Sequence, residues 1–199
     1  MKDKSLYVYI VDDEQKVRDS LSKFLRLYGF KVKAYADAES YLYELDQDEI
    51  GCLISDIDMK DMDGLQLQRR LNEIKCIRPT IFITGHANVD IAVRAMKLGA
   101  VDFIEKPFDP DELAAKVGAA IDLFAERITI LGCYRLLTKK EIEVFKHVAK
   151  GGKNRDIAEK LFISIPTVEA HRSRVMKKMQ AGSLPELVKM SVLLANDPI

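Results

Sequence analysis

The sequence contains no apolar run close to the ~18 residues that a membrane-spanning helix requires. It starts with the polar residues Met1–Ser5, and the apolar run Leu6–Val11 that follows ends in acidic residues. This run is too short for a signal peptide and stops in the wrong residue type. We therefore expect a cytoplasmic protein that has no membrane partner.

Cysteine is also scarce. The chain has Cys52, Cys76 and Cys133, an odd number with no CxxC spacing between them. This count gives no support to a disulfide framework or a zinc site. We interpret the three as small core or surface residues.

Neither sign of charge is in excess over the whole chain, which has 31 basic and 31 acidic residues. The two halves differ, however. Residues 1–125 hold 17 Lys and Arg against 23 Asp and Glu, a balance of −6, whereas residues 126–199 hold 14 against 8, a balance of +6. Such asymmetry suggests that the C-terminal part binds a polyanion. Alternatively, two solvated surfaces could give the same charge totals by chance.

Length and composition indicate two globular domains. The 199 residues are 48% hydrophobic and 31% charged, and they fit one domain of about 120 residues and one of about 65. We place the first domain at 1–125, a linker at 126–136 and the second domain at 137–199.

Apolar runs typical of buried parallel strands alternate with helical patterns over the first 125 residues. The predicted strands are 6–11, 31–35, 52–55, 80–83 and 101–105. Helices follow each strand, and the helix after Gly64 is expected to turn Leu67, Leu71 and Ile74 inward. This alternation predicts an α/β fold, a five-stranded doubly wound parallel sheet of the flavodoxin-like kind.

The pattern changes after Glu126. Residues 127–137 form a connector with no clear period, and only helices follow. Thr138 and Glu141 make a capping box for the first of them. Asn154 is expected to cap a short second helix, and Ser164 a third that runs to about residue 179. We predict a smaller all-α helix-turn-helix domain.

Polar residues follow four of the buried strands. Asp12 and Asp13 come after the first, Asp56 after the third, Thr84 after the fourth and Lys106 after the fifth. Because the carboxyl ends of parallel strands meet at one crevice, we expect these side chains to converge. Acids and a lysine in loops can also simply be solvated, but five at matching strand ends favour a site.

Three converging carboxylates repel one another and need a cation, and oxygen ligands suit Mg²⁺. A carboxylate beside this ion can attack a phosphoryl group in line. In this interpretation Asp56 is the acceptor, Lys106 pairs with the phosphoryl oxygens and Thr84 donates a hydrogen bond to them.

Residues 6–125 resemble the CheY-like receiver domain of response regulators. The matching stretches are Val-Asp-Asp-Glu at 11–14, Ser-Asp-Ile-Asp-Met-Lys-Asp-Met-Asp-Gly at 55–64, Ile-Thr-Gly-His-Ala at 83–87 and Ala-Val-Asp-Phe-Ile-Glu-Lys-Pro-Phe at 100–108. The resemblance implies that Asp56 accepts phosphate from a sensor histidine kinase. It also implies Mg²⁺ ligands from Asp13, Asp56 and the backbone carbonyl of Asp58, with Asp12 assisting through water.

The same resemblance makes Phe103 the aromatic switch residue, together with Thr84, and implies a cis Lys106–Pro107 bond. The chain departs from the family pattern at Lys60, where proline is usual. This change concerns the stiffness and charge of the loop and the lifetime of the phosphoryl group, whereas the phosphorylation chemistry is expected to persist.

A helical wheel separates two faces of residues 164–179. Val168, His171, Val175 and Met179 fall on the side that would face the core. The opposite side is small, with basic edges, and suits the major groove of DNA. The candidate DNA-binding residues are Thr167, Glu169, Ala170, Arg172, Ser173, Arg174 and Lys177.

Different roles are expected within this set. Glu169 can accept from a cytosine amino group, and Ala170 can touch a thymine methyl. Thr167, Arg174 and Lys177 are suited to phosphates, while Arg172 lies near the inner boundary. An ordinary amphipathic helix with a solvated face remains the alternative for the helix taken alone.

Residues 137–195 resemble the LuxR-type helix-turn-helix. The match runs over Leu-Thr-Lys-Lys-Glu-Ile-Glu-Val at 137–144, over 154–161, and over Ile-Ser-Ile-Pro-Thr-Val-Glu-Ala-His-Arg at 163–172. Both parts together resemble FixJ-like regulators. This resemblance implies a transcription regulator rather than an enzyme. The regulator is expected to bind double-stranded DNA and to form a homodimer through the Val89–Phe103 face when phosphorylated. It is also expected to contact RNA polymerase.

Three alternatives stay open. The acidic first domain could mask the basic second one until it is phosphorylated. The pair Asp56 and Asp58 could belong to a metal-dependent phosphohydrolase, although it follows the third strand and Lys60 replaces the threonine that haloacid-dehalogenase-like enzymes carry. Finally, the C-terminal domain could bind protein rather than DNA.

Overall fold

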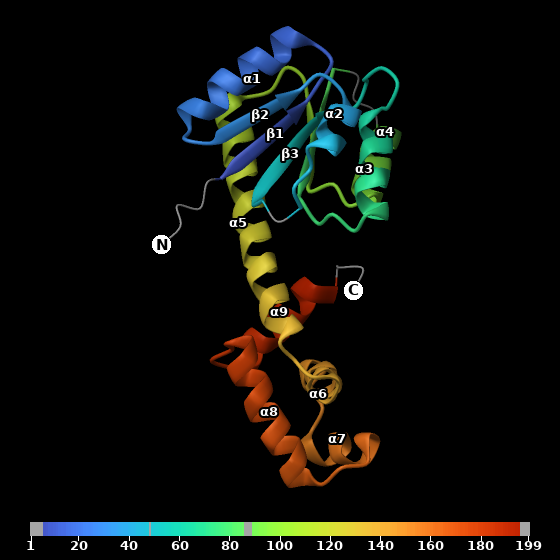
Figure 1. Ribbon diagram of the computed structural model, residues 1–199, viewed down its shortest axis with the longest axis vertical. Helices are drawn as coiled ribbons and strands as arrows, with labels where there is room; N and C mark the ends of the chain where they lie inside the picture. The colour runs from blue at the N-terminus through green and yellow to red at the C-terminus, as the bar shows by residue number, and fades with distance from the viewer. Residues whose placement is uncertain (1–5, 48, 86–88, 196–199) are drawn as a thin grey trace. The chain divides into compact units, whose positions relative to one another are not determined.

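The computed structural model describes residues 6–47, 49–85 and 89–195 of the chain. The chain divides into two compact units, residues 1–125 and residues 126–199 (Figure 1). Within the described ranges, no helix is both long enough and apolar enough to cross a bilayer.

The first unit is built on a five-stranded parallel sheet with the order β2-β1-β3-β4-β5. Its strands are β1 (Tyr7–Val11), β2 (Lys31–Tyr35), β3 (Gly51–Asp56), β4 (Thr80–Thr84) and β5 (Asp102–Glu105). The helices are α1 (Gln15–Leu27), α2 (Ala38–Tyr43), α3 (Gly64–Glu73), α4 (Val89–Lys97) and α5 (Pro110–Arg135). The predicted doubly wound fold is confirmed.

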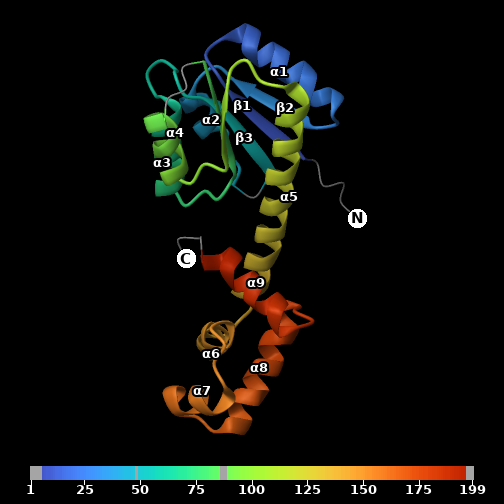
Figure 2. The ribbon, with the colours of Figure 1, turned by 180° about the vertical axis from the view of Figure 1, so that it is seen from behind.

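Helices cover both faces of the sheet (Figures 1 and 2), and alternate residues of the central strands pack against opposite helical layers. Val8 and Ile10 pack with residues of α1 and α5, whereas Tyr9 and Val11 pack with residues of α2 and α3. Because both faces of the strands are buried, they read as continuous apolar runs. The strand order reverses between β1 and β3, and this places a crevice at their carboxyl ends.

The second unit adds α6 (Lys139–Ala149), α7 (Asn154–Leu161), α8 (Ile165–Met179) and α9 (Leu184–Ala195). A tight turn joins α7 to α8. Phe162, at the end of α7, has a left-handed backbone with φ 55°. Ser164 then caps α8, since its hydroxyl accepts from the backbone N–H of Thr167. The predicted helix-turn-helix is therefore present.

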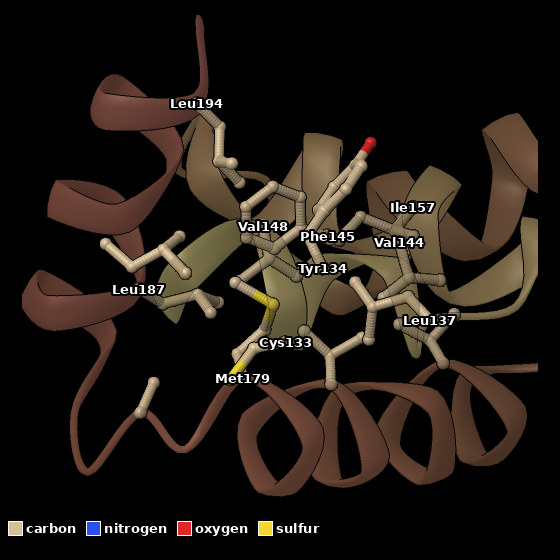
Figure 3. Packing of buried hydrophobic residues seen from close by; sticks show 14 of the residues in the cluster. Cys133, Tyr134, Leu137, Val144, Phe145, Val148, Ile157, Met179, Leu187 and Leu194 are labelled. Carbon is tan, nitrogen blue, oxygen red and sulfur yellow. The ribbon is translucent and has the colours of Figure 1, made fainter. Parts of the chain in front are cut away.

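The prediction of an irregular connector over residues 127–137 is wrong, because α5 continues to Arg135. Cys133 and Tyr134 are buried in the core of the second unit, where the rings of Tyr134 and Phe145 make an edge contact at 5.5 Å (Figure 3). Apolar residues occupy most positions of this stretch, which hid the helical period. All three cysteines are buried and free.

Two local predictions are also wrong. Ile74 does not face inward: α3 ends at Glu73, and Ile74 is the residue after it, 46% exposed. Asn154 does not cap α7, because Lys153 holds the cap position and Asn154 is the first helical residue. By contrast, the capping box of Thr138 and Glu141 is confirmed.

One buried ion pair ties α8 to α6. The Glu141 carboxylate lies 2.6 Å from the Lys178 ammonium and accepts from the backbone N–H of Thr138 at 2.8 Å. Glu141 is only 2% exposed. The bond from Lys178 and that from Thr138 lower the pKa of Glu141 to about 2, against an ordinary value of 4.5.

We expect Glu141→Gln to lower the free energy of unfolding of the second unit by about 1–3 kcal/mol at neutral pH. The pKa of Glu141 is lower in the folded state than in the unfolded one, so its contribution is present above pH 4.5 and is lost as the pH falls towards 2. Urea unfolding followed by circular dichroism at pH 7 and pH 3 measures both effects, and the variant is expected to lose less stability on acidification.

Glu143→Gln is the matched control, since Glu143 pairs with Lys140 on the exposed face of the same helix. It is expected to change stability by less than about 0.5 kcal/mol. Equal effects of the two substitutions would contradict the assignment.

Candidate functional site

The carboxyl ends of four strands bring predicted site residues to one edge of the sheet. Asp12 directly follows β1 and Asp56 is the last residue of β3, and the parallel register of these strands sets the two side by side. Thr84 ends β4, and Lys106 directly follows β5. The convergence expected at the strand ends is thus observed for these residues.

The Lys106 ammonium lies between two buried carboxylates. Its Nζ is 3.1 Å from Oδ2 of Asp12 and 3.2 Å from Oδ1 of Asp56. Asp12 is 2% exposed and Asp56 is 8% exposed. The other oxygen of Asp12 accepts from the backbone N–H of Glu14 at 2.8 Å, which fixes this carboxylate in the loop after β1.

Burial dominates the electrostatics of Asp56 and raises its pKa. Lys106 opposes this shift, whereas Asp12 and Asp58 add to it. For Lys106, burial alone would lower the pKa, but hydrogen bonds and charge attraction from Asp12 and Asp56 outweigh it and raise the pKa. The raised pKa of Lys106 favours its charged form, whereas burial disfavours the charged form of Asp56.

Gly64 lets the chain pass close to the backbone of Asp56. A Cβ atom added to Gly64 would lie 2.3 Å from the backbone carbonyl oxygen of Asp56. The backbone N–H of Gly64 donates to the carbonyl of Ile57 at 3.0 Å. Glycine at this position is what allows α3 to begin against the end of β3.

The Thr84 side chain contacts Asp58. The Thr84 hydroxyl donates to Oδ2 of Asp58 at 3.0 Å. Thr84 is fully buried, while Asp58 is exposed. The receiver resemblance implies only a backbone role for Asp58, and no local pattern in the sequence indicates this side-chain bond.

The predicted metal ligands are present, but they are not gathered into a metal-ready cluster. Among the described residues, no group of three or more acidic, histidine or cysteine side chains is spaced to hold an ion. The Lys106 ammonium lies against Asp12 and Asp56, and the Asp58 carboxylate turns to Thr84. Asp13 is half-buried beside Asp12. The donor chemistry still fits Mg²⁺, since the predicted ligands are carboxylate and carbonyl oxygens.

Phe103 lies on β5 and is half-buried. It packs against the cluster that contains Phe82 of β4 and Ala95 of α4. Large apolar side chains are exposed over the adjoining stretch, and these are Val89, Val93, Met96 and Val101.

The second candidate site is the outer face of α8. Val168, Val175 and Met179 are buried and His171 is half-buried, as the helical wheel predicts. Six of the candidate DNA-binding residues are exposed: Thr167, Glu169, Ala170, Ser173, Arg174 and Lys177. Arg172 is half-buried, and its guanidinium donates to the Asn154 side chain at 2.7 Å.

Comparison with known families decides the class of this chain. Residues 8–118 match the response regulator receiver domain, and residues 135–191 match the bacterial regulatory proteins of the luxR family. The chain belongs to the response regulators. It is a two-component response regulator with a LuxR-type DNA-binding domain, and its family consists of transcription regulators rather than classical enzymes.

Similar proteins match this response regulator over most of its length. The transcriptional regulatory protein FixJ of Rhizobium meliloti is 42% identical over 192 residues, which cover 93% of this chain and 94% of FixJ. TmoT of Ectopseudomonas mendocina is 39% identical over 198 residues, covering 96% and 90%.

Solved structures agree with this membership. Response regulator StyR has a TM-score of 0.60 and 34% identity, with 94% of this chain and 98% of that chain covered. Full-length FixJ from B. japonicum has a TM-score of 0.54 and 37% identity, with 95% and 97% covered.

We expect the pKa of Asp56 in this response regulator to move in opposite directions when its two charged neighbours are neutralised. Lys106→Met removes the attraction and is expected to raise it, whereas Asp12→Asn removes a repulsion and is expected to lower it. The carboxyl carbon shift of Asp56, followed by NMR against pH without divalent ions, measures the change.

Lys116→Met serves as a control, because Lys116 pairs with Asp102 and Glu112 instead. Movement of the Asp56 pKa in the same direction in both site variants would rule out this charge arrangement.

Proposed function

We propose that Asp56 accepts a phosphoryl group from a sensor histidine kinase, and that this controls DNA binding by α8 to regulate transcription. The observation that carries the proposal is the buried Asp12, Asp56 and Lys106 group at the strand ends. Family membership supports the kinase and DNA as partners.

In the transfer step, a carboxylate oxygen of Asp56 attacks phosphorus in line, the new O–P bond forms and the N–P bond of a phosphohistidine breaks, with the electron pair leaving on the imidazole. Mg²⁺ would be held by Asp13, Asp56 and the backbone carbonyl of Asp58, with Asp12 assisting through water, and would neutralise charge on the transferring oxygens. The 3.2 Å distance between Lys106 Nζ and the Asp56 carboxylate supports a contact from Lys106 to that phosphoryl group.

After transfer, Thr84 would exchange Asp58 for the phosphoryl oxygens, and Phe103 would move with it. A hydrogen bond to a charged group is worth about 1.5–3 kcal/mol. Shifting a two-state equilibrium from 1:99 to 99:1 takes about 5.5 kcal/mol. The bonds from Thr84 and Lys106, together with the metal contact, are of sufficient size.

The output is proposed to be a homodimer formed through the Val89–Phe103 face. The exposed Val93 and Met96 on this face support a homodimer, because a two-fold axis would bury the apolar patch of one protomer against the same patch of its partner. A dimer would present two copies of α8 to a two-fold DNA site. RNA polymerase is the further partner that a cytoplasmic transcription regulator of this kind would meet.

We expect Asp56→Asn to abolish labelling of the protein by a small phosphodonor, and chelation of Mg²⁺ to abolish labelling of the unchanged protein. Lys60→Pro is the control and is expected to keep its label, because Lys60 is an exposed loop residue outside the buried carboxylate group. Mass spectrometry of the intact protein measures the label in the Asp56→Asn variant, in the chelated protein and in the Lys60→Pro variant. Repeated turnover of a small phosphomonoester would favour the phosphohydrolase alternative instead.

We expect Lys177→Ala to weaken DNA binding about equally for all sequences and to lower the slope of log affinity against log salt by about 1. Lys177 is exposed on the outer face of α8, where it suits a phosphate. Gel shifts with a salt titration measure this slope. A slope near zero for the unchanged protein would point to a protein ligand rather than DNA.

A further inference from the structure

The Asn154 side chain joins the two helices of the helix-turn-helix. Asn154 is the first residue of α7, and its Oδ1 accepts from the guanidinium of Arg172 at 2.7 Å. Its Nδ2 donates to Oε1 of Glu169 at 3.3 Å. Both partners lie on α8, and both are candidate DNA-binding residues.

Only a side chain with a donor and an acceptor can make this bridge. A guanidinium has donors alone, and a carboxylate has acceptors alone. The carboxamide of Asn154 therefore has one permitted orientation, with its oxygen towards Arg172 and its nitrogen towards Glu169. Lys153 holds the N-cap position of α7 without a side-chain cap bond, and the Asn154 side chain is bonded to α8 instead.

The bridge restricts two long side chains that would otherwise sample many rotamers. Glu169 is exposed, and Arg172 is half-buried. Rotamer-rich side chains lose conformational entropy when they bind, so a side chain held in place before binding loses less. A contact on the outer face of α8 is thus prepared by a residue of the neighbouring helix.

We propose that Asn154 is a positioning residue for sequence recognition: it holds the Glu169 carboxylate where it accepts from a cytosine amino group in the major groove. This rests on the proposed DNA binding by α8. A carboxylate reads a base-edge donor, and cytosine presents its N4 amino group there. Preference at that base pair then depends on a residue outside the recognition helix.

The test selects binding sites from a pool of randomised duplexes, using the full chain treated with a small phosphodonor. Glu169→Ala locates the base pair concerned, where preference for cytosine is expected to fall roughly tenfold, the size of one lost base contact. Asn154→Ala is expected to lower preference at the same base pair by roughly three- to tenfold.

Asn154→Asp separates the two halves of the bridge. It keeps an acceptor for Arg172 but loses the donor to Glu169 and sets a second carboxylate beside it. An acidic residue in the first turn favours the helix, so the expected loss of preference would not come from unfolding of α7. The matched control is Glu159→Ala, which removes an exposed ion pair with Arg155 on the same helix and is expected to leave the preference unchanged.

Each remaining outcome overturns the proposal in a recognisable way. If Asn154→Ala weakens binding to all sequences equally and lowers the melting temperature of the protein, the bridge has a purely structural role. If Glu169→Ala changes base preference at no position of the selected site, the proposed carboxylate contact to cytosine is wrong, although the proposed DNA binding still holds. Absence of any selected sequence, with the unchanged protein as well, would remove the proposed DNA-binding function.

Discussion

The contact of one ammonium with two buried carboxylates governs the chemistry of the receiver unit. Lys106 reaches Asp12 and Asp56 from the end of a different strand, so the ion pairs join the ends of β1, β3 and β5. Two unit charges 4 Å apart interact by about 4 kcal/mol at an effective dielectric constant of 20. The cost of removing these charges from water offsets this attraction, and for Asp56 burial is the larger effect. Under the proposed function, a phosphoryl group on Asp56 would compete with the two carboxylates for the same ammonium.

Helix α8 of the second unit is held by side chains from two other helices. Asn154 of α7 contacts it through Glu169 and Arg172, and Glu141 of α6 holds Lys178 near its last turn. Between these points, Val168 and Val175 are fully buried. Polar contacts thus fix the rotation of α8 about its axis, while apolar packing fixes its distance from the core.

The sheet and the strand-end residues could be predicted because their signals are local. A buried parallel strand is a short apolar run, and the polar residue that ends it lies next in the sequence. Asn154 could not be predicted in the same way, since asparagine before a helix usually indicates a cap and its partners lie 15 and 18 positions further on. The bond between Thr84 and Asp58 joins residues 26 apart. The helix over residues 127–135 could not be predicted for another reason. Its many apolar side chains leave no clear polar face, so the sequence shows no helical period.

The length of α5 affects how such proteins could exchange parts during evolution. Ile130, Cys133 and Tyr134 lie within that helix, yet they belong to the core of the second unit. A recombination junction at residue 136 would leave these three side chains behind and give the transferred domain an unfilled core. A junction near residue 125 would carry the whole core with it. A transferable DNA-binding module with a complete core would therefore begin inside a helix, not at the loop that follows it.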